Sequence, residues 1–180
     1  MGTTLVRKVY PDPRAMSRAV AEQIVALAQE RVAAAGRFTV ALSGGRTPMA
    51  TYELLAAEPL VARMPWAKTR VYFGDERHVP HDHPDSNCRM VSEALLRKAL
   101  VPAENVFPIP TDHEDPASCA EWYEELLRIH FHRRSDRLPF FDLLLLGIGS
   151  DGHTAGIFPG TPAAAERTRW VTCGDATAAD

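Results

Sequence analysis

A carboxylate and an imidazole stand two residues apart in a glycine-rich stretch, residues 147–160. Asp151 and His153 are enclosed there by five glycines in fourteen residues. Repeated glycine indicates positive φ angles or a close approach of the backbone to another group. An imidazole is suited to general-base chemistry near neutral pH, and Asp151 is a candidate for fixing its tautomer. We therefore predict a catalytic pair; the alternative is a tight structural turn that happens to contain a histidine.

A second glycine-bearing loop, Ser43–Pro48, has the features of a phosphate-binding site. Its two adjacent glycines expose backbone N–H groups, and a predicted helix follows directly. The amino terminus of a helix favours anions, and an arginine supplies donors that match phosphate. The loop is neither a Walker A loop nor a G-x-G-x-x-G turn, and the alternative is a plain strand-to-helix turn with a surface arginine. The predicted phosphate-binding residues are Ser43, Gly44, Gly45, Arg46 and Thr47.

A third loop, Gly74–Pro80, carries three charged residues in succession. Arg77 is a candidate for stabilising a developing negative charge. Asp75 or Glu76 could orient Arg77 or a histidine, and we include Asp75 among the residues expected to bind the substrate.

Two other patterns are weaker. Ser150 does not form a nucleophile elbow, because Ile148 occupies the first glycine position of G-x-S-x-G. The histidines and aspartates of residues 78–85 match no zinc-binding spacing, so we interpret them as a polar loop and expect no metal.

Strands and helices must alternate to bring these loops together. The expected strands are residues 5–9, 38–42, 70–73, 105–109, 141–146 and 170–173. The expected helices are residues 13–35, residues 49–55, a segment that runs to about residue 100, and residues 116–130. Pro48 is expected at the first position of the second helix, and Ser86 or Asn87 is expected to cap the third. Residues 133–137 are expected to form a charged turn. The run at 141–146 is apolar and bounded by turn residues, so we expect it to be buried on both faces. Alternation predicts a doubly wound, mainly parallel α/β sheet with helices on both faces, whose three loops meet at one edge.

Composition sets further limits on function. The chain has 180 residues, of which 46% are hydrophobic and 24% charged, with a net charge of −3; this favours one domain over residues 1–180, with neither nucleic acid nor an anionic membrane as its partner. Cys88, Cys119 and Cys173 show no C-x-x-C spacing, and we identify no signal peptide and no run of about 20 apolar residues. We therefore expect a cytoplasmic protein with free thiols.

Together, the three loops resemble the family of 6-phosphogluconolactonases and glucosamine-6-phosphate isomerases. The resemblance is carried by Ser43–Pro48, by Gly74–Pro80 with Ser86 and Asn87, and by Gly147–Gly160, in that order over nearly the whole chain. It implies a Rossmann-like fold. It also implies hydrolysis of 6-phospho-D-glucono-1,5-lactone to 6-phospho-D-gluconate in the oxidative pentose phosphate pathway, without an organic cofactor.

Two positions separate the lactonase from the isomerase branch of that family. Phe158 stands where the isomerase-type loop has a glutamate five residues beyond its histidine, and phenylalanine cannot transfer a proton. Arg77 stands where the isomerase-type loop has an aromatic residue after Asp-Glu. Isomerisation needs several proton-transfer groups, whereas lactone hydrolysis can proceed with one base and an anion stabiliser. The sequence favours hydrolysis; the alternatives are a sugar-phosphate isomerase or deaminase and a non-catalytic sugar-phosphate-binding module.

The resemblance also suggests roles and a boundary. We expect His153 to activate water, Arg77 to stabilise the oxyanion, and Arg46 to hold the phosphate, while Ser86 and Asn87 contact sugar hydroxyls. Lactonases of this type continue with another strand and helices that carry basic residues. We therefore expect a sequence truncated at its C-terminus, or a shortened relative, that acts as a monomer or small homo-oligomer.

Overall fold

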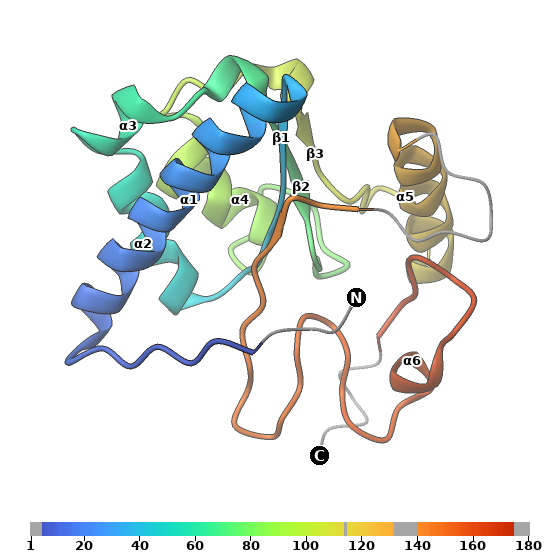
Figure 1. The fold of residues 1–180 in the computed structure, drawn as a ribbon. Coiled ribbons are helices and arrows are strands. Elements are labelled where there is room, and N and C mark those ends of the chain that lie inside the picture. Colours follow the sequence, from blue (N-terminus) through green and yellow to red (C-terminus); the bar gives the residue numbers. More distant parts are fainter. Residues whose placement is uncertain (1–4, 114, 132–139, 175–180) are drawn as a thin grey trace.

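A four-stranded parallel sheet lies at the centre of the computed structural model, which describes residues 5–113, 115–131 and 140–174 (Figure 1). The strands are β1 (Phe38–Leu42), β2 (Thr69–Phe73), β3 (Val106–Phe107) and β4 (Leu143–Leu144), in the order β3-β2-β1-β4. All three pairings are parallel, and Val40 of β1 lies between Val71 of β2 and Leu143 of β4. The predicted charged turn at 133–137 lies outside the described residues.

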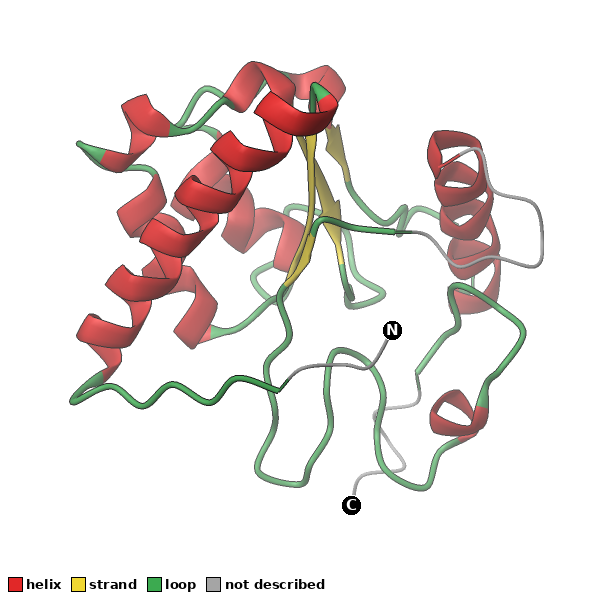
Figure 2. Cartoon of the chain, viewed as in Figure 1, coloured by secondary structure: helices red, strands yellow, loops and turns green. Residues whose placement is uncertain are grey.

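Helices cover both faces of this sheet, as predicted. α1 (Pro13–Ala35), α2 (Arg46–Leu55) and α4 (Asn87–Val91) pack on one face, and α5 (Pro116–Phe131) packs on the other (Figures 1 and 2). Side chains alternate between the faces with the two-residue period of a strand. Val71 and Phe73 of β2 therefore join the larger core under α1, α2 and α4, whereas Tyr72 joins the smaller core under α5. The remaining short helices are α3 (Leu60–Arg63), η1 (Trp66–Lys68), η2 (Ser92–Leu96), η3 (Ala103–Asn105) and α6 (Pro162–Ala165).

Local sequence explains where the helices begin and end. The Asp12 carboxylate accepts a hydrogen bond of 2.7 Å from the Ala15 N–H and caps α1, which ends at Gly36 with a φ of +75°. Ser86 caps α4 through a 3.1 Å hydrogen bond from the Arg89 N–H, which confirms one of the two predicted caps. The helix predicted from Ser86 to about residue 100 is α4 followed by the π-helical turn η2. α2 begins at Arg46, so Pro48 is its third residue and not its first.

Four predicted strands differ from the structure. Residues 5–9 form no strand and are exposed, and residues 170–173 form no strand because a glutamate of α5 binds their backbone. The strand predicted at 105–109 is reduced to the two residues of β3. The expectation that 141–146 is buried on both faces was wrong: β4 has two residues at the edge of the sheet, and Leu144 is 46% exposed. Apolarity indicated a strand, but it could not show that the strand pairs on one side only.

This strand order places the three loops on one side of the sheet. From β1 the chain passes through α2 to β2, which lies on one side of β1. Strand β4 lies on the other side of β1, so the strand order reverses between β1 and β4. Ligands of open α/β sheets bind in the crevice at such a reversal, outside the carboxyl ends of the strands. The chain after β4 forms mostly loops there, drawn in orange to red in Figure 1 and green in Figure 2. Within the described residues, every helix is too short or too polar to cross a membrane.

Candidate active site

The loop after β1 is fixed by the helix that follows it. The Tyr52 hydroxyl of α2 donates to the Ser43 carbonyl at 2.8 Å and accepts from the Ser43 N–H at 3.0 Å. Tyr52 is completely buried, and this burial raises the pKa of its hydroxyl, which therefore remains a donor at neutral pH. Gly45 has a φ of +104°, which directs the chain into α2 and leaves Arg46 and Thr47 exposed at its amino terminus.

Asn87 joins this loop to the loop after β2. A Cβ atom on Gly44 would lie 1.9 Å from the Asn87 side-chain oxygen, so only glycine allows this approach. The Asn87 amide nitrogen donates to the Asp75 carboxylate and to the Asp75 carbonyl, both at 3.1 Å. Asn87 is 2% exposed and therefore links the first two loops from inside the protein. Ser86 is 1% exposed. This burial favours a structural role for both residues over the predicted contact with sugar hydroxyls.

Glu76 organises the same loop, although it was not among the predicted site residues. Its carboxylate accepts hydrogen bonds from the N–H groups of Arg77, Asn87 and Cys88 at 2.7–2.8 Å and from the Ser86 hydroxyl at 3.1 Å. Two of these N–H groups belong to the first turn of α4, where a carboxylate is favourable. The sequence signal for this role was the helix-capping pair Ser86-Asn87, which begins ten residues after Glu76.

Arg77 lies in the same loop and is exposed. Its guanidinium donates to the carbonyl of Asp85, which holds the turn between β2 and α4. Burial raises the pKa of Asp75, and the charge of Arg77 opposes this rise.

The loop after β4 brings Asp151 and His153 into contact, as predicted. The His153 Nδ1 atom lies 2.6 Å from an Asp151 oxygen, which also accepts from the His153 N–H at 3.2 Å. These two hydrogen bonds lower the pKa of Asp151, so it accepts as a carboxylate. Nδ1 must then be the donor, and in the neutral ring Nε2 is the basic nitrogen. The ring lies against Phe158, with centroids 4.7 Å apart, and over Gly149, where a Cβ would come within 2.3 Å of it.

Asp75 shows that the second and third loops share one electrostatic environment. Burial raises the pKa of Asp75 above its ordinary value, while the charges of Arg77 and His153 act in the opposite direction. Asp75 and Glu76 also line a cavity of about 360 Å³ together with residues 155–157, immediately beyond His153. Arg46 is placed differently: it lines a pocket of about 700 Å³ between α1 and α2. Asp75 thus interacts electrostatically with both Arg77 and His153, while the predicted phosphate anchor lines a separate pocket that shares no residue with this cavity.

Within residues 5–113, 115–131 and 140–174, no cluster of three or more His, Cys, Asp or Glu side chains could hold a metal ion. Two histidines of the 78–85 loop instead contact backbone carbonyls: His78 Nε2 lies 3.0 Å from that of His113, and His81 Nε2 lies 2.8 Å from that of Ile109.

Asp75→Asn is expected to stabilise the protein at pH 7. Because burial raises the pKa of Asp75, the folded state binds more protons than the unfolded state between the ordinary and the raised value, so stability falls as pH rises through that window. Asparagine does not ionise, so it removes this loss of stability. The urea midpoints of the variant and the wild type, compared between pH 3 and pH 7, measure the difference.

Asp151→Asn is the matched control with the opposite sign. Its pKa is lowered by hydrogen bonds from the backbone and ring of His153, so its stabilisation is present above its ordinary pKa and is lost as pH falls through the lowered value. The variant should be less stable than the wild type at pH 7. Equal changes of the urea midpoint in the same direction for both variants would contradict the opposite pKa shifts of Asp75 and Asp151.

Comparison with known proteins identifies the family. Residues 11–179 match the sequence profile described as glucosamine-6-phosphate isomerases/6-phosphogluconolactonase. A curated relative from Nostoc sp., named 6-phosphogluconolactonase, is 41% identical over 168 residues, which cover 93% of this chain and 68% of the relative. A relative of the same name from Synechocystis sp. is 46% identical over 144 residues, which cover 80% of this chain and 58% of the relative.

Solved structures agree with these sequence relatives. The 6-phosphogluconolactonase from Trypanosoma cruzi has a TM-score of 0.79 at 33% identity and is matched over 89% of this chain and 65% of its own. The 6-phosphogluconolactonase from Trypanosoma brucei has a TM-score of 0.76 at 34% identity and is matched over 91% of this chain and 67% of its own. The chain therefore spans between 58% and 68% of the length of these four relatives. It belongs to the glucosamine-6-phosphate isomerase/6-phosphogluconolactonase family.

Proposed function

We propose that the protein hydrolyses 6-phospho-D-glucono-1,5-lactone to 6-phospho-D-gluconate in the oxidative pentose phosphate pathway. The observation that carries this proposal is the 2.6 Å contact between His153 and Asp151, in a loop at the carboxyl end of β4. This contact leaves Nε2 as the basic nitrogen of the pair. The names of the relatives from Nostoc sp. and Synechocystis sp. support the same activity.

In the proposed reaction His153 acts first as base and then as acid. Nε2 takes a proton from water while the water oxygen attacks the lactone carbonyl carbon. The resulting oxyanion is stabilised by Arg77. The bond between that carbon and the ring oxygen then breaks, and the imidazolium returns its proton to the departing oxygen. Asp151 keeps the ring in the required tautomer and stabilises its charged form.

The phosphate is held at the first loop. Arg46, the amides of Gly44 and Gly45, and the hydroxyls of Ser43 and Thr47 form the proposed anchor, because they surround the amino terminus of α2. Asp75 contacts the sugar end of the substrate from the second loop. No metal and no organic cofactor take part in this scheme.

Arg46→Ala is expected to raise the KM for the phosphorylated lactone about 10- to 100-fold and to leave that for glucono-1,5-lactone nearly unchanged. Loss of one charge-assisted hydrogen bond costs about 1.5–3 kcal/mol. Initial rates with fresh lactone, corrected for spontaneous opening, measure the effect. Arg14→Ala is the matched control, because Arg14 lines the same pocket between α1 and α2 but belongs to α1. An equal effect of Arg46→Ala on both lactones would exclude Arg46 as the anchor.

A sugar-phosphate isomerase is less well supported by the site. Phe158 lies against the His153 ring, at the position where an isomerase would need a proton-transfer group. A sugar-phosphate-binding module without catalysis is the other candidate. It would be stabilised thermally by 6-phosphogluconate without any turnover of lactone. We further propose that the protein is cytoplasmic and acts as a monomer or small homo-oligomer.

A further inference from the structure

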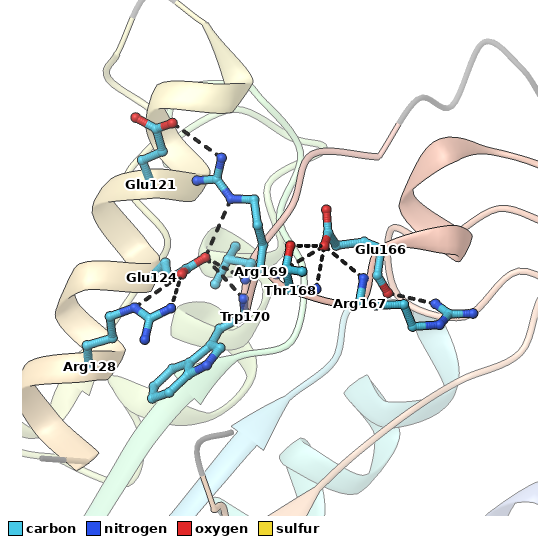
Figure 3. A network of polar contacts seen from close by, with 9 residues as sticks. Glu121, Glu124, Arg128, Glu166, Arg167, Thr168, Arg169 and Trp170 are labelled. Carbon is cyan, nitrogen blue, oxygen red and sulfur yellow. Dashed lines mark hydrogen bonds and ion pairs between the residues drawn. The ribbon is translucent and has the colours of Figure 1, made fainter. Parts of the chain in front are cut away.

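A buried carboxylate on α5 holds the segment that follows the His153 loop. The Glu124 side chain is 11% exposed, and its Oε2 atom accepts hydrogen bonds from the N–H groups of Trp170 at 3.1 Å and Val171 at 3.3 Å. Its Oε1 atom accepts two hydrogen bonds from the Arg128 guanidinium (Figure 3). Both carboxylate oxygens therefore have partners, and two of these partners are backbone groups of a chain segment with no regular secondary structure.

Two arginines complete this contact. Arg169 places its Nε atom 3.6 Å from Glu124 and donates to Glu121 at 3.3 Å, and the Arg128 guanidinium lies 4.3 Å above the Trp170 ring (Figure 3). Burial alone would raise the pKa of Glu124, but the hydrogen bonds from Arg128 and from the backbone lower it below its ordinary value. Glu124 is therefore charged at neutral pH, and its removal would leave two partly buried N–H groups without their acceptor.

The held segment reaches the catalytic loop within a few residues. A Cβ atom on Gly174 would lie 1.9 Å from the carbonyl oxygen of Gly156, so the two backbones are in direct contact. Gly156 lies in a tight turn in which Thr154 and Ile157 exchange backbone hydrogen bonds of 3.2 and 2.9 Å. Thr154 directly follows His153, and its hydroxyl donates to the Gly147 carbonyl at 2.8 Å. A continuous set of contacts therefore runs from α5 to the turn that directly follows His153.

We propose that Glu124 is a positioning residue for His153, acting through residues 170–174 and the turn at 154–157. This inference rests on the proposed function, because positioning matters only if His153 is the base. The carboxylate holds residues 170 and 171 against α5. Residue 174, three residues further along, limits how far the turn can move. Small displacements of a base relative to its substrate are costly for catalysis, so such support is important even though Glu124 does not contact the substrate.

Glu124→Gln tests this inference, because glutamine preserves the shape but removes the charge and one acceptor oxygen. We expect kcat to fall about tenfold with KM changed by less than about twofold, since the loss concerns the reacting geometry and not substrate binding. Glu121→Gln is the matched control: Glu121 lies one turn earlier on α5, also binds Arg169, and is 63% exposed. It should leave kcat within about twofold of the wild type.

A signal from His153 separates positioning from a general loss of stability. The ring of Phe158 lies 4.7 Å from that of His153, so the ring-proton chemical shift of His153 reports its position. We expect this resonance, assigned by its loss in His153→Ala, to move in Glu124→Gln and in Gly174→Ala, but not in Glu121→Gln. Gly174→Ala leaves the Glu124 contacts intact and pushes directly on the turn, so it decides the question alone if Glu124→Gln does not fold.

A shift of the Trp170 backbone amide in Glu124→Gln without movement of the His153 signal would overturn the inference. So would an unmoved His153 signal in Gly174→Ala. Failure of the proposed function gives a different result. The wild-type protein would then show no turnover of lactone, while the His153 resonance would still report whether Glu124 positions the ring.

Discussion

His153→Ala is expected to lower kcat for the phosphorylated lactone by about 10²–10⁴-fold, which is the usual contribution of a general acid–base residue. The same imidazole is proposed to serve in both steps, first accepting a proton from water and then returning it to the ring oxygen. KM should change far less, because the proposed phosphate anchor lies in a different loop. Initial rates under saturating lactone, corrected for spontaneous opening, measure the loss.

Another histidine–aspartate pair of the chain supplies the control. His83 Nδ1 lies 3.7 Å from an Asp85 oxygen, in the loop between β2 and α4, and both side chains are exposed. His83→Ala should leave kcat nearly unchanged. A comparable loss in both variants would show that the effect does not come from base catalysis at residue 153.

Asp151→Asn should lie between these extremes. Asparagine can donate to Nδ1 as well as accept from it, so it also permits the tautomer in which Nδ1, facing residue 151, is the basic nitrogen. The pair is about 40% exposed, and water therefore supports the ring in part. We expect kcat to fall about 10- to 100-fold, less than for loss of the imidazole itself. Full activity of Asp151→Asn would show that the 2.6 Å contact has no role in orienting the base.

Local sequence was sufficient to predict the parts of this site that depend on strand ends. An apolar run followed by glycine indicates where a buried strand stops and a ligand-binding loop begins, and this rule located the loops after β1, β2 and β4. The contact between Asp151 and His153 was also within reach of sequence reasoning, because only Gly152 separates the two residues and they lie in a glycine-rich turn. The end of α1 followed from Gly36, and the start of α4 followed from one of the two candidate caps, Ser86.

Contacts between distant segments could not be predicted in the same way. Glu76 was assigned to charge orientation in an exposed loop, but its carboxylate caps the first turn of α4, more than ten residues ahead. Residues 170–173 have the apolar, β-branched character of a strand, yet their N–H groups bond to Glu124 of α5 and not to a neighbouring strand. Arg46 was placed at the amino terminus of a helix by sequence, but sequence could not show that it also lines a pocket between α1 and α2. Each of these outcomes depends on which partner lies nearby in space.

Gly44→Ala is expected to destabilise the protein by about 3 kcal/mol, the sum of overpacking and of a disturbed buried hydrogen bond. The added Cβ would lie 1.9 Å from Oδ1 and 2.4 Å from Cγ of Asn87. Asn87 cannot move aside easily, because it is 2% exposed and its amide donates to Asp75 twice. Gly44 does not have a positive φ, so the cost is steric and not conformational. Urea unfolding measures it as a lower midpoint with an unchanged m-value.

Gly147→Ala separates this steric cost from the general effect of replacing a loop glycine. Gly147 also lies in a site loop, lacks a positive φ, and has nothing within 4 Å of an added Cβ. Its substitution should change stability by less than about 0.5 kcal/mol. Asn87→Ala should be destabilising alone but should reduce the penalty of Gly44→Ala, because the two changes relieve one contact and are not additive. If the two penalties simply add, Gly44 and Asn87 do not join the first two loops, and the loop after β1 depends on its hydrogen bonds with Tyr52.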